Sequence, residues 1–533
     1  MQESPTPKTK RIVSFGNVAL LLIAAALVSQ LLGFLRTKLV NANFDALGPN
    51  STDAYFAAFN IPDFFFYTLA AGVLGVAFIP VLSDRLQKGD KRGMWELTSS
   101  LLNLLSMVMF AVAVVIFIFA EPLIHHLVAP NLNSTQLHNA ATIMRFLALN
   151  PLFFTASGIL TSVQQTLGRF FFYAIAPLFY NLSIIASIFI FRNTHFGLKG
   201  LGLGAFVGGL LQLLVVCVGL VGTKFSWRPK IMWRSGDFKM ILRQLPPRAF
   251  DQGIDQIQTI VETNFARRLG EGYVSYYNNA ATLQTAPTLL IGTAISTAAF
   301  PRLAQRLSQG RPDLFRRDFL RILRFIIWLV IPVVIVSFFG RGYLAHLIYT
   351  RNSTYIPLIF GYLTVAIFFQ TIYTIISRWF YAQKDTRTPL FVSIFTVALN
   401  IFLAAVLARP SSYGVTGLAL SVSFASMTEV LLLGTIMVIR DRGLLNMAFW
   451  GGVGRIISVG GFSMLSGFLT VSFYPLGAAD RGADLLIKLG LITLAIFGTH
   501  ITISGLFGLE EARPIFRWLK RIVVRPVRTP YQP

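Results

Sequence analysis

The sequence predicts an all-α polytopic membrane protein with about 14 transmembrane helices. Charged residues make up only 13% of the 533 residues, whereas an ordinary soluble domain carries roughly 25%. Hydrophobic residues make up 54%, including 48 phenylalanines, and apolar stretches of about 20 residues recur along the chain. This composition excludes a disordered chain, a coiled coil and a soluble multidomain enzyme.

Each expected span is long enough to cross a hydrocarbon layer of about 30 Å at about 1.5 Å per residue. The first apolar run follows a polar tail, residues 1–12, and has the length of a signal peptide. Because further spans follow it along the whole chain, we expect it to be retained as the first helix. The expected spans are 13–41, 52–84, 94–120, 136–165, 170–191, 199–222, 238–267, 273–304, 314–339, 354–382, 387–408, 414–439, 449–473 and 483–507.

The positive charge of the chain is a topology signal. The formal net charge is +24, from 46 Lys and Arg against 22 Asp and Glu. If both termini are cytoplasmic, most of the basic residues fall in cytoplasmic segments, above all in the linker 223–237 and the tail 508–533. The positive-inside rule therefore predicts a multi-pass protein with both ends in the cytoplasm. We expect the charge to attract anionic membrane lipids and not nucleic acid.

The chain contains an internal duplication. IPVLSDRLQKG (79–89) resembles FPRLAQRLSQG (300–310), and further along Asn181 aligns with Asn400 and Gly200 with Gly417, at a nearly constant displacement. Each repeat holds an even number of spans, so the halves share their orientation.

The duplication defines the expected domains. We expect an N-lobe at 13–222, a C-lobe at 238–439 of the same orientation, and two extra helices within 440–507. A two-lobed duplicated bundle is typical of alternating-access transporters.

One span carries an unusual stripe of ionisable residues. A charged side chain in hydrocarbon costs at least about 2.5–3.5 kcal/mol, so such residues usually face a cavity. In span 238–267, Arg248, Asp251, Asp255 and Glu262 follow one another at intervals that place them on one helix face. We expect them to line a hydrated cavity that handles a cation or a proton. The alternative is structural ion pairing of Arg248 with Asp251 or Asp255.

No catalytic constellation is visible in the sequence. The six histidines lack metal-ligand spacing near carboxylates, and there is no phosphate-binding glycine loop, so ATP is not an evident energy source. The single cysteine, Cys217, excludes an internal disulfide and a cysteine-based metal site. The sequence therefore favours a transporter without cofactor over an enzyme.

Five further motifs stand out in the sequence: LLGFLRTKLVNANF (31–44), STDAYFAAFNIPDFF (51–65), AGVLGVAFIPVLSD (71–84), DQIQTIVETNFA (255–266) and KDTRTPL (384–390). They resemble the MurJ/MviN lipid II flippases, which belong to the superfamily of multidrug, oligosaccharidyl-lipid and polysaccharide exporters. The resemblance implies a V-shaped pair of six-helix lobes around a cationic cavity, with the two extra helices forming a groove for a polyprenyl tail. It also implies lipid II as the substrate, a role in peptidoglycan synthesis at the bacterial cytoplasmic membrane, and contacts with the cell-wall synthesis machinery.

The resemblance assigns roles to single residues. Arg36 and Asp53 match positions of the family's first two helices, and with Arg248 they are the expected substrate-binding residues. Asp255, Glu262 and Asn400 are the expected cation-coupling residues for Na⁺ or H⁺, since Glu262 and Asn400 match positions of a sodium site in some members.

The chain also departs from the family pattern at positions where charged residues are usual. Uncharged residues stand at Gln30, Thr37, Phe66, Tyr67, Ala71, Thr282 and Ala404.

These departures leave alternatives open. The protein could export another polyprenyl glycan or a drug-like substrate, or serve as a non-transporting envelope scaffold. Arg36 and Lys38 argue against cationic drugs, and a scaffold would tolerate the loss of Arg36. We expect Arg36 to bind the lipid diphosphate through two parallel hydrogen bonds. The alternative is that it reaches the membrane interface or pairs with Asp53.

Overall fold

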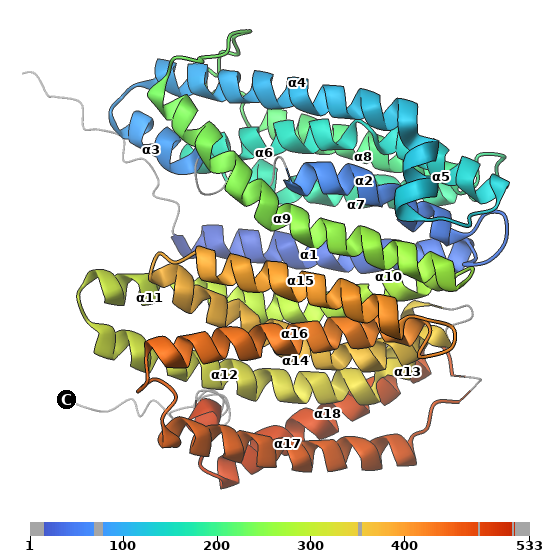
Figure 1. The fold of residues 1–533 in the computed structure, drawn as a ribbon, viewed down its shortest axis with the longest axis vertical. Helices are drawn as coiled ribbons and strands as arrows, with labels where there is room; N and C mark the ends of the chain where they lie inside the picture. Colours follow the sequence, from blue (N-terminus) through green and yellow to red (C-terminus); the bar gives the residue numbers. More distant parts are fainter. Residues whose placement is uncertain (1–14, 69–77, 350–353, 478–479, 514–515, 517–533) are drawn as a thin grey trace, which may run out of the picture. The chain divides into compact units, whose positions relative to one another are not determined.

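The computed structural model describes residues 15–68, 78–349, 354–477, 480–513 and 516. Over these residues the chain is helical and contains no β-strand. It divides into two compact units, residues 1–260 and 261–533, whose boundary falls within one long helix. Each unit is described by itself below (Figure 1).

Unit 1 begins with α1 and ends within α9. Side-chain caps define several of its helix starts: Ser51 caps α2, Asp90 caps α4, and Asn133 forms a capping box with Gln136 at α5. Its helices are α1 Phe15–Asn43, α2 Thr52–Phe66, α3 Ile79–Gln87, α4 Lys91–Leu123, the π-helical turn η3 Ile124–Val128, α5 Ser134–Leu147, α6 Asn150–Thr166, α7 Phe171–Phe191, α8 Lys199–Val218 and the greater part of α9 Gly236–Leu269.

Unit 2 holds the end of α9 and all later helices. They are α10 Tyr273–Pro287, the π-helical turn η4 Thr288–Thr293, α11 Ala294–Ser308, α12 Pro312–Phe339, α13 Arg341–Ile348, α14 Tyr355–Ala382, α15 Arg387–Leu407, α16 Val415–Arg440, α17 Met447–Phe473, α18 Gly482–Leu506 and the short 3₁₀ turn η5 Glu510–Ala512.

Ten helical segments of the described chain are long and apolar enough to cross a membrane. The other four expected spans, 13–41, 52–84, 238–267 and 273–304, also contain helices but are not among these ten, for which only the described residues were considered. The polytopic all-α class is confirmed, and the count of 14 stays a prediction.

The expected span 136–165 is not one continuous helix. It divides into α5 and α6 at Ala148 and Leu149, because Pro151 stands in the first turn of α6 and has no amide hydrogen to continue the helical ladder. The span 273–304 is likewise divided, into α10, η4 and α11.

Helix packing repeats between the two units. In unit 1, α7 packs on α8, α8 on α5 and α6, and α5 on α2 and α4. In unit 2, α15 packs on α16, α16 on α14, and α14 on α10 and α12. These are the same neighbours in the order that the duplication predicts, while α17 and α18 pack on each other and on α12. Two related lobes and two additional helices are therefore confirmed.

Glycines at equivalent positions of the two repeats allow two consecutive helices to approach closely. A Cβ atom at Gly200 would collide with the Phe191 ring at the end of α7, and one at Gly417 would collide with the carbonyl of Leu407 at the end of α15. The second helix of each pair starts directly against the end of the first, so only glycine fits there.

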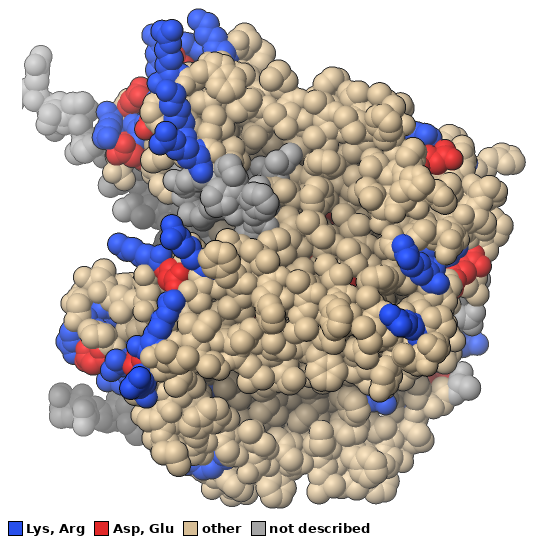
Figure 2. All heavy atoms as spheres, viewed as in Figure 1, with Lys and Arg blue, Asp and Glu red and all other residues tan. Residues whose placement is uncertain are grey.

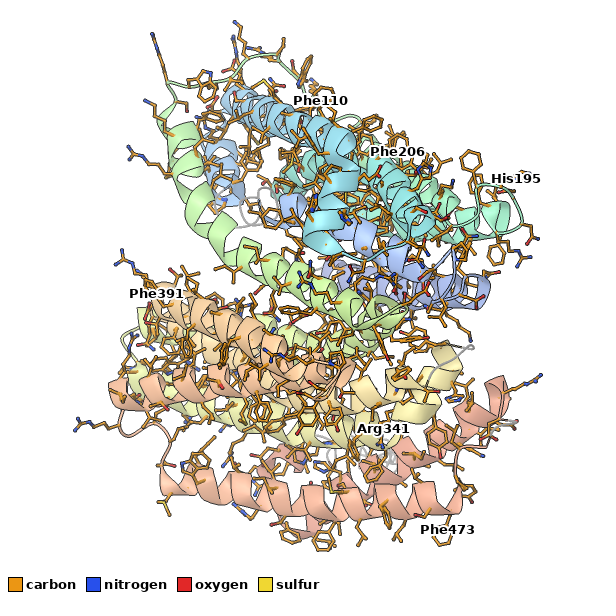
Figure 3. The ribbon with its side chains drawn as sticks, turned by 45° about the vertical axis from the view of Figure 1, so that its right-hand side comes forward. Phe110, His195, Phe206, Arg341, Phe391 and Phe473 are labelled. Carbon is orange, nitrogen blue, oxygen red and sulfur yellow. The ribbon has the colours of Figure 1, made fainter. Side chains whose placement is uncertain are left out.

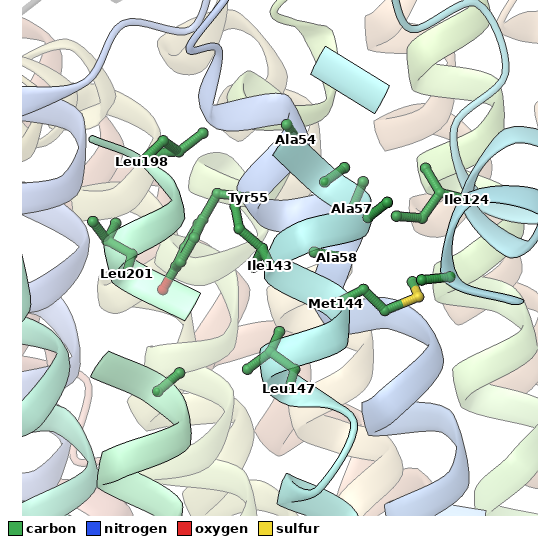
Figure 4. Packing of buried hydrophobic residues seen from close by; sticks show 14 of the residues in the cluster. Ala54, Tyr55, Ala57, Ala58, Ile124, Ile143, Met144, Leu147, Leu198 and Leu201 are labelled. Carbon is green, nitrogen blue, oxygen red and sulfur yellow. The ribbon is translucent and has the colours of Figure 1, made fainter. Parts of the chain in front are cut away.

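Small residues allow close packing inside unit 1 as well. Ala54, Ala57 and Ala58 of α2 are fully buried, in one apolar cluster with Ile143 and Met144 of α5 (Figure 4). Close backbone approach is the main source of helix association where lipid removes the hydrophobic driving force.

The surface matches a lipid environment. On the face shown in Figure 2, Lys and Arg gather toward helix ends, and large areas between them carry no charge. Many large apolar side chains are exposed on the flanks of the helices, among them Phe117, Phe402 and Leu494. Such exposure is unfavourable in water and favourable in hydrocarbon.

Candidate functional site

The first candidate site surrounds Arg36 in unit 1. Arg36 is half-buried on α1 and interacts electrostatically with Tyr55 and Asp63 of α2 and with Tyr180 of α7. Its guanidinium makes no salt bridge or hydrogen bond with another described residue. Three helices of one lobe therefore bring together a cation with unused donors, a carboxylate and two phenols.

Asp53 has a different setting. Its side chain is fully buried in the first turn of α2, directly after the cap in which its backbone N–H donates to Ser51 Oγ at 3.1 Å. A carboxylate here complements the positive end of the helix dipole. Among the described residues no ion pair joins Arg36 to Asp53, and the roles expected of the two residues stay predictions. The position of Asp53 indicates a role in starting α2.

The predicted stripe lies on one continuous helix, α9. Along it, the Asp255 side chain is exposed, whereas Glu262 is buried with only 8% of its surface accessible. The side chains of Arg248 and Asp251 lie outside the described residues, and with them the alternative of ion pairing by Arg248. The two acids that can be compared therefore have opposite exposure.

The second candidate site surrounds Glu262 in unit 2. Asn400 Nδ2 of α15 donates to Glu262 Oε1 at 2.8 Å, and the Tyr277 hydroxyl of α10 donates to Glu262 Oε2 at 2.8 Å. Asn400 and Tyr277 are also buried. The amide oxygen of Asn400, Oδ1, is buried and has no hydrogen-bond partner among the described atoms. One turn on, Ala404 is also buried.

The structure joins two of the predicted residues, Glu262 and Asn400, and adds one that sequence reasoning missed. Tyr277 lies in the polar run YVSYYNNAATLQT of α10. A buried tyrosine hydroxyl usually finds a partner, so a tyrosine in a membrane span next to an unexplained acid was the available signal. Nothing in the sequence indicated which of the neighbouring tyrosines meets the acid.

A polar layer in unit 2 was also missed. Gln284 Nε2 of α10 donates to Gln370 Oε1 of α14 at 2.7 Å, and Gln370 Nε2 donates to Ser426 Oγ of α16 at 3.3 Å. Close by in sequence on α14, the Arg378 guanidinium lies 5.6 Å from the Phe300 ring centroid. Amide chains of this kind fix helix register because each buried polar group needs its partner.

The two sites differ in the ligands that they can take. Unpaired guanidinium donors suit a phosphate or a carboxylate. A buried carboxylate beside an amide oxygen without a donor suits a proton or a hard cation, which prefers oxygen ligands. Among the described residues, no group of three or more His, Cys, Asp or Glu side chains is placed to hold a metal ion.

Comparisons with known proteins agree with this arrangement. A family model described as "Lipid II flippase MurJ" matches residues 46–468. The chain is 27% identical over 527 residues to a "Probable lipid II flippase MurJ" of Bdellovibrio bacteriovorus, covering 94% of this chain and 96% of that protein. It is 26% identical over 445 residues to a "Lipid II flippase MurJ" of Burkholderia cenocepacia, covering 78% and 82%.

Solved structures share the fold. A lipid II flippase MurJ in an inward closed conformation superposes with a TM-score of 0.75 at 22% identity, covering 93% of this chain and all of that one. An inward-facing multidrug resistance transporter of the MATE family superposes with a TM-score of 0.62 at 16% identity, covering 80% of this chain and 98% of that one. Because the family model spans most of the sequence, this chain belongs to the MurJ family of lipid II flippases.

Proposed function

We propose that this protein moves lipid II, the undecaprenyl-diphosphate-linked peptidoglycan precursor, across the bacterial cytoplasmic membrane by alternating access. The observation that carries the proposal is Arg36, a half-buried cation with unused donors inside a lobe of this family's fold. A lipid diphosphate loses hydration when it enters a low-dielectric site. Charge-assisted hydrogen bonds from a guanidinium offset that cost.

The surroundings of Arg36 suit a reversible site. Asp63 interacts with Arg36 electrostatically without forming a close ion pair, so the guanidinium donors stay available to a substrate. Tyr55 and Tyr180 add hydroxyl groups at the same place, and a phenol can donate to a phosphate oxygen. The substitution of Phe66 and Tyr67 for basic residues leaves Arg36 as the principal described cation of this site. We infer that fewer contacts hold the headgroup here than in most relatives.

Transport is coupled, in this proposal, to a cation that binds at Glu262. The carboxylate accepts from Asn400 and Tyr277, and an arriving Na⁺ would bind the Glu262 carboxylate together with Asn400 Oδ1. Protonation of Glu262 is the competing mechanism, because a proton would occupy one of the same lone pairs.

Alternating access is supported by the conformations in which this fold is known. A MurJ protein with this fold was solved in an inward closed conformation, and MATE family transporters were solved in inward-facing and outward-facing conformations. We further propose that both termini are cytoplasmic and that the protein delivers its substrate to the cell-wall synthesis machinery.

Rescue of bacteria depleted of their own lipid II flippase tests the function. The wild-type chain should restore growth and cell shape, and Arg36→Ala at equal membrane abundance should not. Failure of the wild-type chain to rescue, despite normal insertion, would favour export of another polyprenyl glycan or a scaffold role.

Labelling of single cysteines tests the topology separately. After Cys217→Ser, the variants Ser134→Cys and Ser235→Cys place one thiol at the first residue of α5 and one directly before α9. In spheroplasts an impermeant thiol reagent should modify position 134 and not position 235. Modification of position 235 from outside would overturn the proposed orientation.

A further inference from the structure

A hollow of about 580 Å³ lies in unit 1, apart from both candidate sites. One wall is α4, with Phe110, Val114 and Phe117, and the opposite wall is α8, with Leu203 and Phe206. Figure 3 labels Phe110 and Phe206 on these two helices. The floor is the break between α5 and α6 at Leu149, so the interrupted span creates the space.

The hollow follows the membrane-spanning part of α4. Its lining residues on that helix extend from Phe110 to Ile118, which is about 12 Å along the axis at about 1.5 Å per residue. Exposed polar residues, Glu121, His125 and His126, come directly after this stretch. One end of the apolar hollow therefore lies where α4 passes from hydrocarbon to the polar interface.

Among the described residues, Arg145 of α5 is the only charged one that lines the hollow. Its Nε–H donates to the carbonyl oxygen of Phe117 at 3.3 Å. That carbonyl lies beside the kink of α4 at Phe119, where Pro122 cannot donate to the carbonyl four residues earlier. The Nη groups of Arg145 bond to no other described residue, and no carboxylate lines the hollow.

We propose that this hollow binds an anionic membrane phospholipid, with an acyl chain along the phenylalanines and the phosphate on Arg145. A cation at the polar end of an apolar trough matches the chemistry of such a lipid, because a guanidinium binds phosphate with two parallel donors. An apolar helix of a partner protein would cover the trough but leave Arg145 uncompensated at the edge of hydrocarbon, which is unfavourable.

Native mass spectrometry of the full-length protein tests the site. Phosphatidylglycerol and phosphatidylcholine of identical acyl chains are titrated, and the bound fractions yield dissociation constants. The wild type should prefer phosphatidylglycerol. Arg145→Gln should weaken its binding about tenfold or more, since one charge-assisted hydrogen bond is worth about one decade in affinity.

Two further variants separate the site from general effects. Arg192→Gln removes another arginine of unit 1 that donates to Asn43 Oδ1 and lies 5.5 Å from the Phe189 ring, outside the hollow, and it should change nothing. Val114→Trp fills the hollow, keeps Arg145, and should weaken binding as well. Equal affinities for the two phospholipids, or equal effects of Arg145→Gln and Arg192→Gln, would overturn the proposal. So would selective binding of undecaprenyl diphosphate in place of phosphatidylglycerol.

Discussion

The two repeats carry opposite charges at corresponding places. Arg36 stands seven residues before the last residue of α1, Asn43, and Glu262 stands seven residues before the last residue of α9, Leu269. α1 and α9 are the first helices of the two repeats. A cation on the first helix of one repeat therefore corresponds in position to an anion on the first helix of the other.

The asparagines that align between the repeats, Asn181 and Asn400, make different contacts. Asn400 of α15 donates to the Glu262 carboxylate at 2.8 Å. Its counterpart Asn181 of α7 donates to the backbone carbonyl of Ser29 on α1 at 3.5 Å, the limit of a hydrogen bond. An amide N–H can stabilise an anion but not a guanidinium, so only the second repeat forms a strong contact.

The loops between the fourth and fifth spans of the two repeats also carry opposite charges. In unit 2, Asp385 accepts hydrogen bonds from Thr388 and from Arg440 at the end of α16. In unit 1, Arg169 donates to the carbonyls of Gly219 and Val221 after α8. Both contacts tie the same loop to the end of the sixth span, with an anion in one repeat and a cation in the other. The two repeats therefore share their helix packing and differ in the charge of single residues at these contacts.

The largest expected effect is at Arg36. Arg36→Ala should reduce the rate of lipid II flipping by about 100-fold or more, because two hydrogen bonds to a charged group contribute about 1.5–3 kcal/mol each. Arg36→Lys keeps the charge without the planar fork and should be intermediate. Reconstituted vesicles at matched protein content provide the measurement.

Lys38→Ala is the matched control for Arg36, since Lys38 lies two residues further along α1 and points elsewhere on the helix. It should flip within about twofold of the wild type, as expected for a lysine that extends to the interface. Normal flipping by Arg36→Ala would contradict the proposal that the substrate site lies in the first repeat.

The next effect concerns ion dependence and the second repeat. Glu262→Gln should lower the flipping rate about tenfold and make it insensitive to the Na⁺ or proton gradient, because the cation loses its carboxylate ligand. Asp255→Asn, at the exposed acid of the same helix, should keep the gradient dependence. Equal behaviour of the two variants would show that burial at Glu262 has no part in coupling.

Substitution of each of the two aligned asparagines compares how much their contacts stabilise the two repeats. Asn400→Ala removes a donor from a buried carboxylate and should lower the free energy of unfolding by about 1–3 kcal/mol. Asn181→Ala removes only a long contact to a backbone oxygen and should cost about 0.5 kcal/mol or less. Thermal unfolding in the same detergent measures both. A larger loss for Asn181→Ala would contradict the difference drawn between the lobes.

The smallest effect is a pH dependence confined to the second repeat. Although burial opposes it, hydrogen bonds from Thr388 and Arg440 lower the pKa of Asp385 to about 2, from an ordinary value of 3.8. A depressed carboxylate pKa stabilises the fold fully above about pH 4, and that contribution disappears as the pH falls toward 2. Asp385→Asn should therefore lower the melting temperature at pH 6 and converge on the wild type near pH 2.

Arg169→Gln is the corresponding control in the first repeat. An arginine stays charged over this whole range, so its effect should not change between pH 6 and pH 2. A difference between wild type and Asp385→Asn that persists at pH 2 would show that the loop contact does not depend on ionisation.

By itself, the sequence determined the all-α membrane class, the duplication and the family motifs. These follow from local properties: apolar runs of spanning length, repeated residues such as Gly200 and Gly417, and the run from Arg36 onward are readable without knowing any contact. Glu262 and Asn400 were also identified as a pair, through their match to family positions.

Tertiary structure alone decided which partners complete the sites. Tyr277 of α10 donates to Glu262 of α9, Asp53 lies in the first turn of α2, and Arg145 donates to a carbonyl beside the kink in α4. Helical periodicity indicates which side chains share a face of one helix, but it carries no information on the rotation of neighbouring helices. Partners that come from separate spans are therefore fixed only by packing, where each buried polar group selects the donor or acceptor within its reach.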